Sequence, residues 1–282
     1  MNTHHRWIVI ANALIAALLG VLTAQVLHEA CHGLAAVLVG AEWQAFNLFA
    51  VLWAWPGAAN ETGALIIEAN PALMNILTGL LAAFLFTRPS VRQHSMLSLY
   101  LMYFAGYSIF MGFGYLLIDP LFYQSGGENL GDWKKVIDML GGSWAVRLPL
   151  LLVGAAGTMW GFFWLAGAAM RFAKDATDKS ERQRVALPLL LIPYFAINIL
   201  FTIFSLWHPM GPEGIVVVVF QYWFGYIGFF WAFFFAAYWL NYKTPYADAR
   251  PLPDKVSVPW AVAAGIALFV AAAILLPTVT FV

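Results

Sequence analysis

Seven long apolar runs, separated by short polar connections, constrain the fold of this chain more than any other feature. Each is long enough to cross the hydrocarbon core of a membrane as a helix, which takes roughly 20 residues. The runs cover residues 7–27, with the helix continuing to 39, and residues 64–87, 95–118, 144–170, 185–206, 214–240 and 258–280. The sequence therefore predicts an all-α polytopic membrane protein with about seven transmembrane helices in a lipid bilayer.

The composition excludes several other classes of protein. Hydrophobic residues make up 62% of the chain and charged residues only 10%, and the mean hydropathy is +0.78. These values lie far outside the range of ordinary soluble domains, and no connection is long enough to hold one. The formal net charge is zero and no basic cluster occurs, so nucleic acid is not an expected partner. Cys31 is the only cysteine, which excludes an internal disulfide.

The basic residues predict how the chain is oriented. With seven spans, most lysines and arginines fall on the side of the N-terminus, and only Lys134, Lys135 and Arg147 fall on the other side. Cytoplasmic loops are the ones enriched in lysine and arginine. We therefore expect an integral protein of the plasma (inner) membrane, with a cytoplasmic N-terminus and an outside C-terminus. The basic residues assigned to the cytoplasm are Arg6, Arg88, Arg92, Arg171, Lys174, Lys179, Arg182, Arg184, Lys243, Arg250 and Lys255.

A metal-binding motif lies at the end of the first span. His28-Glu29-Ala30-Cys31-His32 matches the pattern H-E-x-x-H. Because an α-helix has 3.6 residues per turn, His28 and His32 lie on one face and can bind the same zinc ion. Glu29 is then placed to act as general base for a water molecule that the zinc activates. The alternative is a trio of polar residues that form hydrogen bonds at the membrane interface.

A catalytic zinc site needs a third protein ligand. Asp132 is the first choice because the glycine-rich stretch of residues 126–131 delivers its carboxylate to the start of a short amphipathic helix on the outer side. Aspartate is also a preferred N-cap, so Asp132 has the alternative role of accepting a backbone hydrogen bond. The other candidates on the outer side are Asp119, Glu128, Glu68, His208 and Glu213.

The connection between the first two spans, residues 41–60, is too apolar for a solvated loop and too short for a span. A re-entrant hairpin that dips into the membrane is one interpretation, since non-helical backbone survives there when it is paired or buried in protein. An interfacial belt of tryptophans is the other.

The second span has a polar stripe facing protein or water. Glu68, Ala72, Asn75 and Gly79 share one helix face, and Asn70 precedes a proline near the outer end. Asn70 and Asn75 are candidates for holding a substrate backbone or an oxyanion. Ordinary hydrogen bonds between helices are the alternative.

The first half of the chain, up to about residue 140, resembles the site-2 protease family of intramembrane zinc metalloproteases. The resemblance is carried by the H-E-x-x-H helix, the apolar segment after it, the Asn-Pro element at residues 70–75 and the later Gly131-Asp132. It implies that His28, His32 and Asp132 bind zinc, that Glu29 is the base, and that residues near 44–55 present the substrate. Residues 1–141 would then be the metalloprotease-like core, and residues 142–282 four additional transmembrane helices.

The chain also departs from that family. It has Leu130-Gly131-Asp132 where the family usually has Leu-Asp-Gly, and the charge distribution places the site toward the outside rather than the cytosol. Its connections are also too short to hold a regulatory soluble domain. These differences indicate a divergent or minimal member.

The sequence thus favours a membrane-embedded zinc metallopeptidase that cleaves membrane protein or peptide substrates. The alternative is a non-enzymatic polytopic membrane protein, a transporter or receptor, with a vestigial or structural metal site. A retinal protein is not favoured, because every lysine lies in a connection between the predicted spans. A transporter would need more intramembrane charge than the last three spans carry. The oligomeric state is open.

Overall fold

Seven helical segments are long and apolar enough to cross a membrane in the computed structural model, which describes residues 3–125, 131–240, 242–244 and 246–281. Their bounds agree with the predicted spans to within a few residues, except that the fifth helical segment begins six residues earlier and the last one ends five residues earlier than predicted. The segments are Thr3–Leu38 (α1), Glu61–Phe86 (α2), Ser95–Phe122 (α4), Trp144–Met170 (α6), Lys179–Trp207, Pro212–Trp239 and Val258–Leu275.

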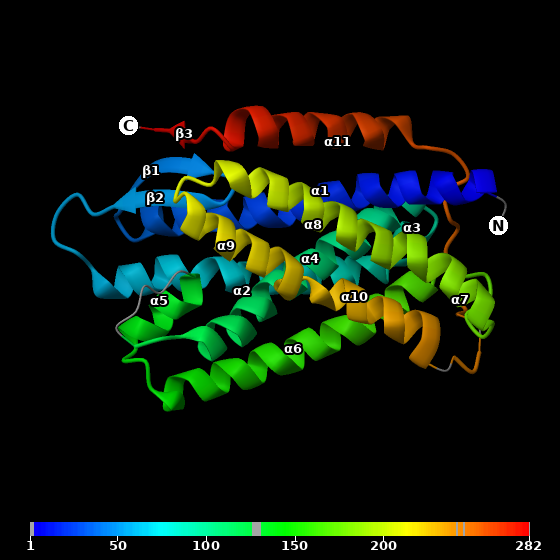
Figure 1. The fold of residues 1–282 in the computed structure, drawn as a ribbon, viewed down its shortest axis with the longest axis horizontal. Coiled ribbons are helices and arrows are strands. Elements are labelled where there is room, and N and C mark those ends of the chain that lie inside the picture. The colour runs from blue at the N-terminus through cyan, green and yellow to red at the C-terminus, as the bar shows by residue number, and fades with distance from the viewer. Residues whose placement is uncertain (1–2, 126–130, 241, 245, 282) are drawn as a thin grey trace.

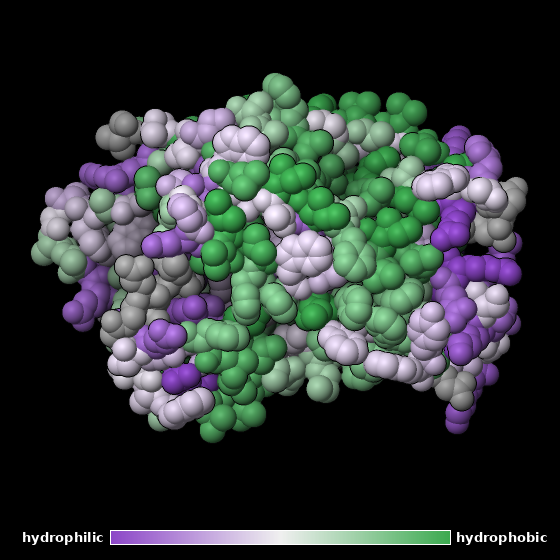
Figure 2. Space-filling view, viewed as in Figure 1, coloured by the Kyte–Doolittle hydropathy of each residue, from purple (hydrophilic) through white to green (hydrophobic). Residues whose placement is uncertain are grey.

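The helices form one bundle along the long axis of the molecule, with the two termini at opposite ends (Figure 1). Hydrophobic residues cover the middle of the visible face, and hydrophilic residues gather at both ends (Figure 2). This distribution is the one that a lipid bilayer requires. The chain is a predominantly helical, polytopic integral membrane protein.

Three spans contain non-α turns. The fifth span consists of Lys179–Ala186 (α7), Leu187–Leu191 (η1), Ile192–Phe204 (α8) and Ser205–Trp207 (η2). The sixth consists of Pro212–Phe220 (α9), Gln221–Gly225 (η3), Ile227–Phe234 (α10) and Phe235–Trp239 (η4). The seventh consists of Val258–Val270 (α11) and Ala271–Leu275 (η5). All but η2 of the η segments are π-helical, a geometry that is frequent at functional sites. Two short helices outside the spans are Pro89–Arg92 (α3) and Asp132–Met139 (α5).

A small sheet follows the first span. Glu42–Asn47 (β1) and Ala50–Ala54 (β2) pair antiparallel as a hairpin, which was one of the two interpretations of this segment. Val279–Thr280 (β3) adds to the other side of β1, giving the order β2-β1-β3. The prediction of a helix up to residue 280 is therefore wrong. The helix ends at Leu275 because Pro277 follows and Thr278 adopts a positive φ of 71°, which no α-helix accommodates.

The hairpin packs along α1, and its turn contacts α1 well before the C-terminal end of that helix. The Trp43 ring covers Gly33, at which a Cβ atom would lie 2.2 Å from the ring. The backbone carbonyl of Leu48, in the turn of the hairpin, accepts a hydrogen bond from Gln25 Nε2 at 3.0 Å. At about 1.5 Å per residue, Gln25 lies roughly 20 Å before the end of α1 at Leu38.

Helix α4 lies at the centre of the bundle, and its backbone packs closely against the backbones of α2 and α6. At Gly112 of α4, a Cβ atom would lie 2.6 Å from the carbonyl oxygen of Ala72, and at Gly154 of α6 it would lie 2.4 Å from the amide nitrogen of Leu117. Only glycine permits such close approach of two helix backbones. The C-terminal half of α4 is thereby held close to α2 and α6.

Candidate metal centre

His28, His32 and Asp132 come together at one end of the bundle. Asp132 Oδ2 lies 3.0 Å from His28 Nε2 and 3.2 Å from His32 Nε2. The three ligand atoms all lie within 4.8 Å of one another. The two histidines come from the C-terminal part of α1 and the aspartate from the first turn of α5, so a segment about one hundred residues away closes the group, as the sequence predicts.

The neighbours of the two imidazoles fix the orientation of the rings. His32 Nδ1 lies 2.9 Å from the backbone oxygen of Ile67 in α2, so Nδ1 donates a hydrogen bond to it and Nε2 faces Asp132. The His28 ring stacks on the Tyr115 ring, with 5.2 Å between centroids and 10° between planes. A backbone carbonyl that fixes the tautomer of a ligand histidine is common around zinc. Two imidazoles and one carboxylate are also a donor set that catalytic zinc uses.

Asp132 reaches the histidines because a second aspartate caps its helix. Asp119 Oδ2, at the end of α4, accepts hydrogen bonds from the backbone N–H groups of Trp133 at 3.0 Å and Lys134 at 3.3 Å. Gly131 precedes Asp132 with φ of 128°, which favours glycine, and a Cβ atom there would lie 3.0 Å from Asp119 Oδ2. Asp119 therefore takes the capping role that was the alternative for Asp132.

The electrostatic surroundings keep Asp132 ionised. Burial alone would raise the pKa of its carboxyl, but His32 and His28 hold that pKa well below its usual range. A deprotonated carboxylate is the form that binds a metal. The N–H groups that donate to Asp119 are at the N-terminal end of α5, so the positive end of the helix dipole lies beside the carboxylates of Asp119 and Asp132.

The remaining candidates for the third ligand have other partners. Both oxygens of Glu68 bind Lys135 Nζ, at 3.2 and 3.1 Å. His208 stacks on Phe49 in the hairpin turn, and its Nδ1 accepts a hydrogen bond from the amide of Met210. Glu213 is exposed on the first turn of α9. Glu128 lies outside the described residues.

Glu29 is buried beside the histidines and is held by a hydrogen-bond network. Gln25 Nε2 donates to Glu29 Oε1 at 2.9 Å and also to the carbonyl of Leu48. Tyr222 of η3 donates from its hydroxyl to Gln25 Oε1 at 2.8 Å, which fixes the orientation of the amide. The network thus links the motif helix, the hairpin turn and the sixth span.

Sequence reasoning missed the roles of Gln25 and Tyr222. Gln25 carries a local signal, because it lies one helical turn before Glu29 on the same face. Tyr222 carries none, since only the packing of the sixth span against α1 brings it to Gln25.

The two asparagines of α2 bind the neighbouring helices. Asn70 Nδ2 donates to the carbonyl of Cys31 at 3.2 Å. Asn75 Nδ2 donates to the carbonyl of Ala24 at 3.5 Å and to the sulfur of Met111 at 2.8 Å. These contacts match the interhelical alternative of the sequence analysis and fix α2 against α1. Substrate binding by either residue stays a prediction.

Comparison with protein-family models, with curated proteins and with solved structures finds no match to this chain. No relative therefore assigns a metal or a substrate to these residues.

Proposed function

We propose that this protein is a membrane-embedded zinc metallopeptidase that hydrolyses peptide bonds of membrane-associated substrates. The observation that carries the proposal is the convergence of His28, His32 and Asp132, with the Glu29 carboxylate beside them. Four ionisable side chains gathered inside an apolar bundle are costly unless they serve a site. In this assignment His28 Nε2, His32 Nε2 and an oxygen of Asp132 hold the zinc ion.

The chain's own residues supply the proton transfers. Bound zinc would contribute Lewis acidity, which acidifies water and polarises a carbonyl group. Gln25 Nε2 donates a hydrogen bond to Glu29 Oε1, so we assign the proton transfers to the other carboxylate oxygen, Oε2. Glu29 Oε2 accepts a proton from the attacking water and returns it to the leaving amine nitrogen.

The sheet offers an edge for an extended substrate. One side of β1 is covered by β2 and the other by β3, so β2, within the described residues, keeps a free edge. An extended peptide can add to such an edge through backbone hydrogen bonds. The hairpin turn at Leu48, hydrogen-bonded to α1 well before the end of that helix, supports a hairpin that enters the membrane and presents this edge at the depth of the metal centre.

The proposal agrees with the resemblance to site-2 proteases. One difference is that Asp132 follows a glycine here, whereas the aspartate usually precedes the glycine in that family. The charge distribution supports a cytoplasmic N-terminus, an outside C-terminus and a location in the plasma membrane, which would place the metal centre near the outer surface.

The test is peptide hydrolysis by the purified full-length protein in lipid nanodiscs, with a fluorogenic library of apolar peptides as substrate. Glu29→Gln should lower the rate by about 10²-fold or more, which is the contribution typical of a general base. Zinc content should be unchanged in this variant. Glu61→Gln, at an exposed position in the first turn of α2, is the matched control and should keep the rate of the wild type. Undiminished hydrolysis by Glu29→Gln would falsify the assignment of the base.

A further inference from the structure

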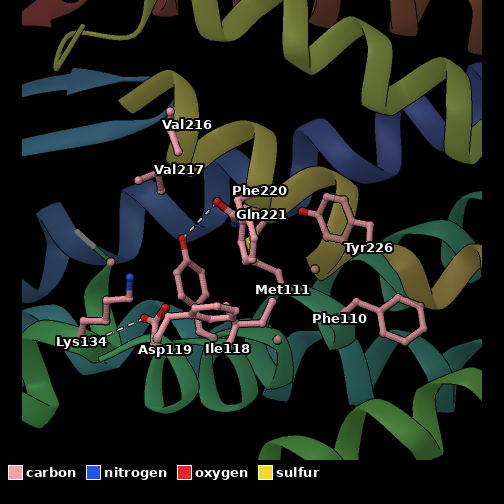
Figure 3. Close-up of a pocket in the computed structure, with 15 residues that line it drawn as sticks. Phe110, Met111, Ile118, Asp119, Lys134, Val216, Val217, Phe220, Gln221 and Tyr226 are labelled. Carbon is pink, nitrogen blue, oxygen red and sulfur yellow. Dashed lines mark hydrogen bonds between the residues drawn. The ribbon is translucent and has the colours of Figure 1, made fainter. Parts of the chain in front are cut away.

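An apolar cavity of about 220 Å³ lies beside the metal centre, between α4 and the α9–η3 part of the sixth span (Figure 3). At one end it is lined by Tyr115, whose ring stacks on His28, and by Gly131, which precedes Asp132. Its apolar walls carry Phe110, Met111, Ile118, Phe122, Val216 and Phe220.

Two facing glycines leave this space open. A Cβ atom on Gly114 of α4 would have only the Cα of Gly225 within 4 Å, at 3.9 Å. A Cβ atom on Gly225 would meet only Gln221, at 3.8 Å. Both glycines line the cavity and both are buried. Elsewhere on α4, a Cβ atom on Gly112 would meet the α2 backbone, so Gly114 is unusual in facing empty space rather than a neighbouring helix.

The wall also holds a buried polar group without a partner. Gln221 Oε1 accepts a hydrogen bond from the Tyr115 hydroxyl at 3.3 Å, as Figure 3 shows. Gln221 Nε2 is buried and has no hydrogen-bond partner in the described part of the chain. A buried N–H group is costly when it is unpaired. The cavity therefore suits a ligand that brings an apolar group together with a carbonyl oxygen.

We propose that this cavity binds the large apolar side chain of the substrate residue next to the cleaved bond, and that Gln221 Nε2 donates to a backbone carbonyl of the same segment. This inference rests on the proposed peptidase function and names its substrate preference. The size fits, because a cavity of about 150 Å³ already accommodates benzene. The position fits as well, because the same Tyr115 bounds the cavity and stacks on a residue of the metal centre.

The first test measures binding without turnover. The probe is a capped amino-acid amide, N-acetyl photo-phenylalanine N-methylamide, crosslinked to the full-length protein in nanodiscs with a metal chelator present. Mass spectrometry should place the adducts on cavity residues such as Met111 and Phe220. Gly114→Leu fills the cavity and should reduce labelling by about tenfold or more, since each methylene in such a pocket has a large effect.

The control for this variant is Gly265→Leu on α11, where an added Cβ atom meets nothing within 4 Å. It should leave labelling unchanged. Gly114→Ala adds a single methyl group and should give an intermediate loss, which keeps the test valid if the leucine variant does not fold. Labelling that persists in both Gly114 variants, or that maps outside the cavity, would overturn the proposal. So would an alkyl-diazirine fatty acid that labels the cavity in preference to the amide, since that result would identify a lipid acyl chain as the occupant.

The second test measures cleavage preference in the same peptide library. The wild type should prefer leucine or phenylalanine beside the cleaved bond, and Gly114→Leu should shift the preference to alanine or glycine. The two proposals can fail separately. Cavity-specific labelling without any hydrolysis supports the cavity and contradicts the peptidase, whereas hydrolysis with an unchanged preference in Gly114→Leu overturns the cavity and leaves the peptidase intact.

Discussion

The two aspartates at the candidate metal centre have different roles because they occupy different positions relative to the N-terminus of α5. Asp132 lies in the first turn of α5 and turns toward the histidines, while Asp119 lies at the end of α4 and accepts the free amides of that turn. A helix terminus with unpaired N–H groups requires such an acceptor. The position of Asp132 therefore depends on Asp119.

Replacing Asp119 by alanine should weaken metal binding without removing a ligand. Loss of a cap costs about 0.5–2 kcal/mol of stability. Loss of a group that orients a ligand typically lowers metal affinity about 10–100-fold. Asp119→Asn keeps an acceptor oxygen and should restore most of the affinity. The measurement is a zinc titration of the metal-free protein, and an Asp119→Ala affinity equal to that of the wild type would refute the positioning role.

Tyr222 should influence hydrolysis through Gln25 and Glu29. Tyr222→Phe removes the hydroxyl that fixes the Gln25 amide, a hydrogen bond worth about 1 kcal/mol, and should lower kcat roughly fivefold with zinc content unchanged. The control is Tyr103→Phe, which removes a buried hydroxyl that donates to the Leu189 carbonyl in another part of the bundle. Equal effects of the two substitutions on kcat would show that Tyr222 contributes only to general stability.

The sequence predicted the part of the site that depends on local spacing. His28, Glu29 and His32 follow from helical periodicity, and Asp132 is the first choice among the outer-side candidates because a glycine-rich stretch places its carboxylate at a helix start. The cap by Asp119 and the contact from Tyr222 could not be predicted in this way. Both depend on how helices distant in the sequence pack against one another.

Among the elements, the hairpin depends on one glycine of the motif helix. Gly33 directly follows His32 in the sequence, and the Trp43 ring packs against it so closely that a side chain at residue 33 would collide with the ring. The hairpin position, and with it the free edge of β2, is therefore set by the absence of a Cβ atom at residue 33.

Gly33→Ala should displace the hairpin and reduce hydrolysis. Overpacking a tight contact costs about 1–3 kcal/mol, while alanine in a helix gains about 1 kcal/mol over glycine. Gly265→Ala provides the same propensity gain on α11 without a contact, so the difference in thermal stability between the two variants isolates the Trp43 contact. The account requires Gly33→Ala to be the less stable and less active variant. The opposite order would show that the hairpin is not held at this point.

The seven spans were predictable because hydrophobic length alone defines a membrane helix. The hairpin segment was recognisable because residues 41–60 are too apolar for a solvated loop. Strand β3 was not predicted, since Val279 and Thr280 follow an apolar run without interruption by charge, and their pairing with β1 depends on tertiary contact. Hydropathy does not distinguish the last turn of a span from a short strand.

At the scale of the whole molecule, the two halves of the chain contact each other around the candidate metal centre. The residues of the candidate metal centre come from α1 and α5. Tyr222 of the sixth span reaches Gln25, and Asn47 of the hairpin donates to the carbonyl of Leu276 after the seventh span. The additional four helices predicted for residues 142–282 thus contact the surroundings of the candidate site. They also supply one wall of the cavity beside it.

The predicted orientation can be measured with single cysteines, because the one native cysteine, Cys31, is buried. Ser143→Cys, before α6, should react with a membrane-impermeant maleimide in intact cells. Ser180→Cys, in α7 at the opposite end of the bundle, should react only after permeabilisation (Figure 1). Both positions are exposed. The reverse pattern of labelling would place the candidate metal centre on the cytoplasmic side.

The most direct test of the account is zinc stoichiometry combined with X-ray absorption at the zinc edge, on the purified full-length protein. We expect one zinc per chain in the wild type, with two imidazole nitrogens and carboxylate oxygen in the first coordination sphere. Asp132→Ala should lose the bound metal, while Asp138→Ala, which removes a carboxylate from the other end of the same helix, should retain it. A wild-type protein that binds no zinc, or an Asp132→Ala variant that binds it as tightly as the wild type, would contradict the account.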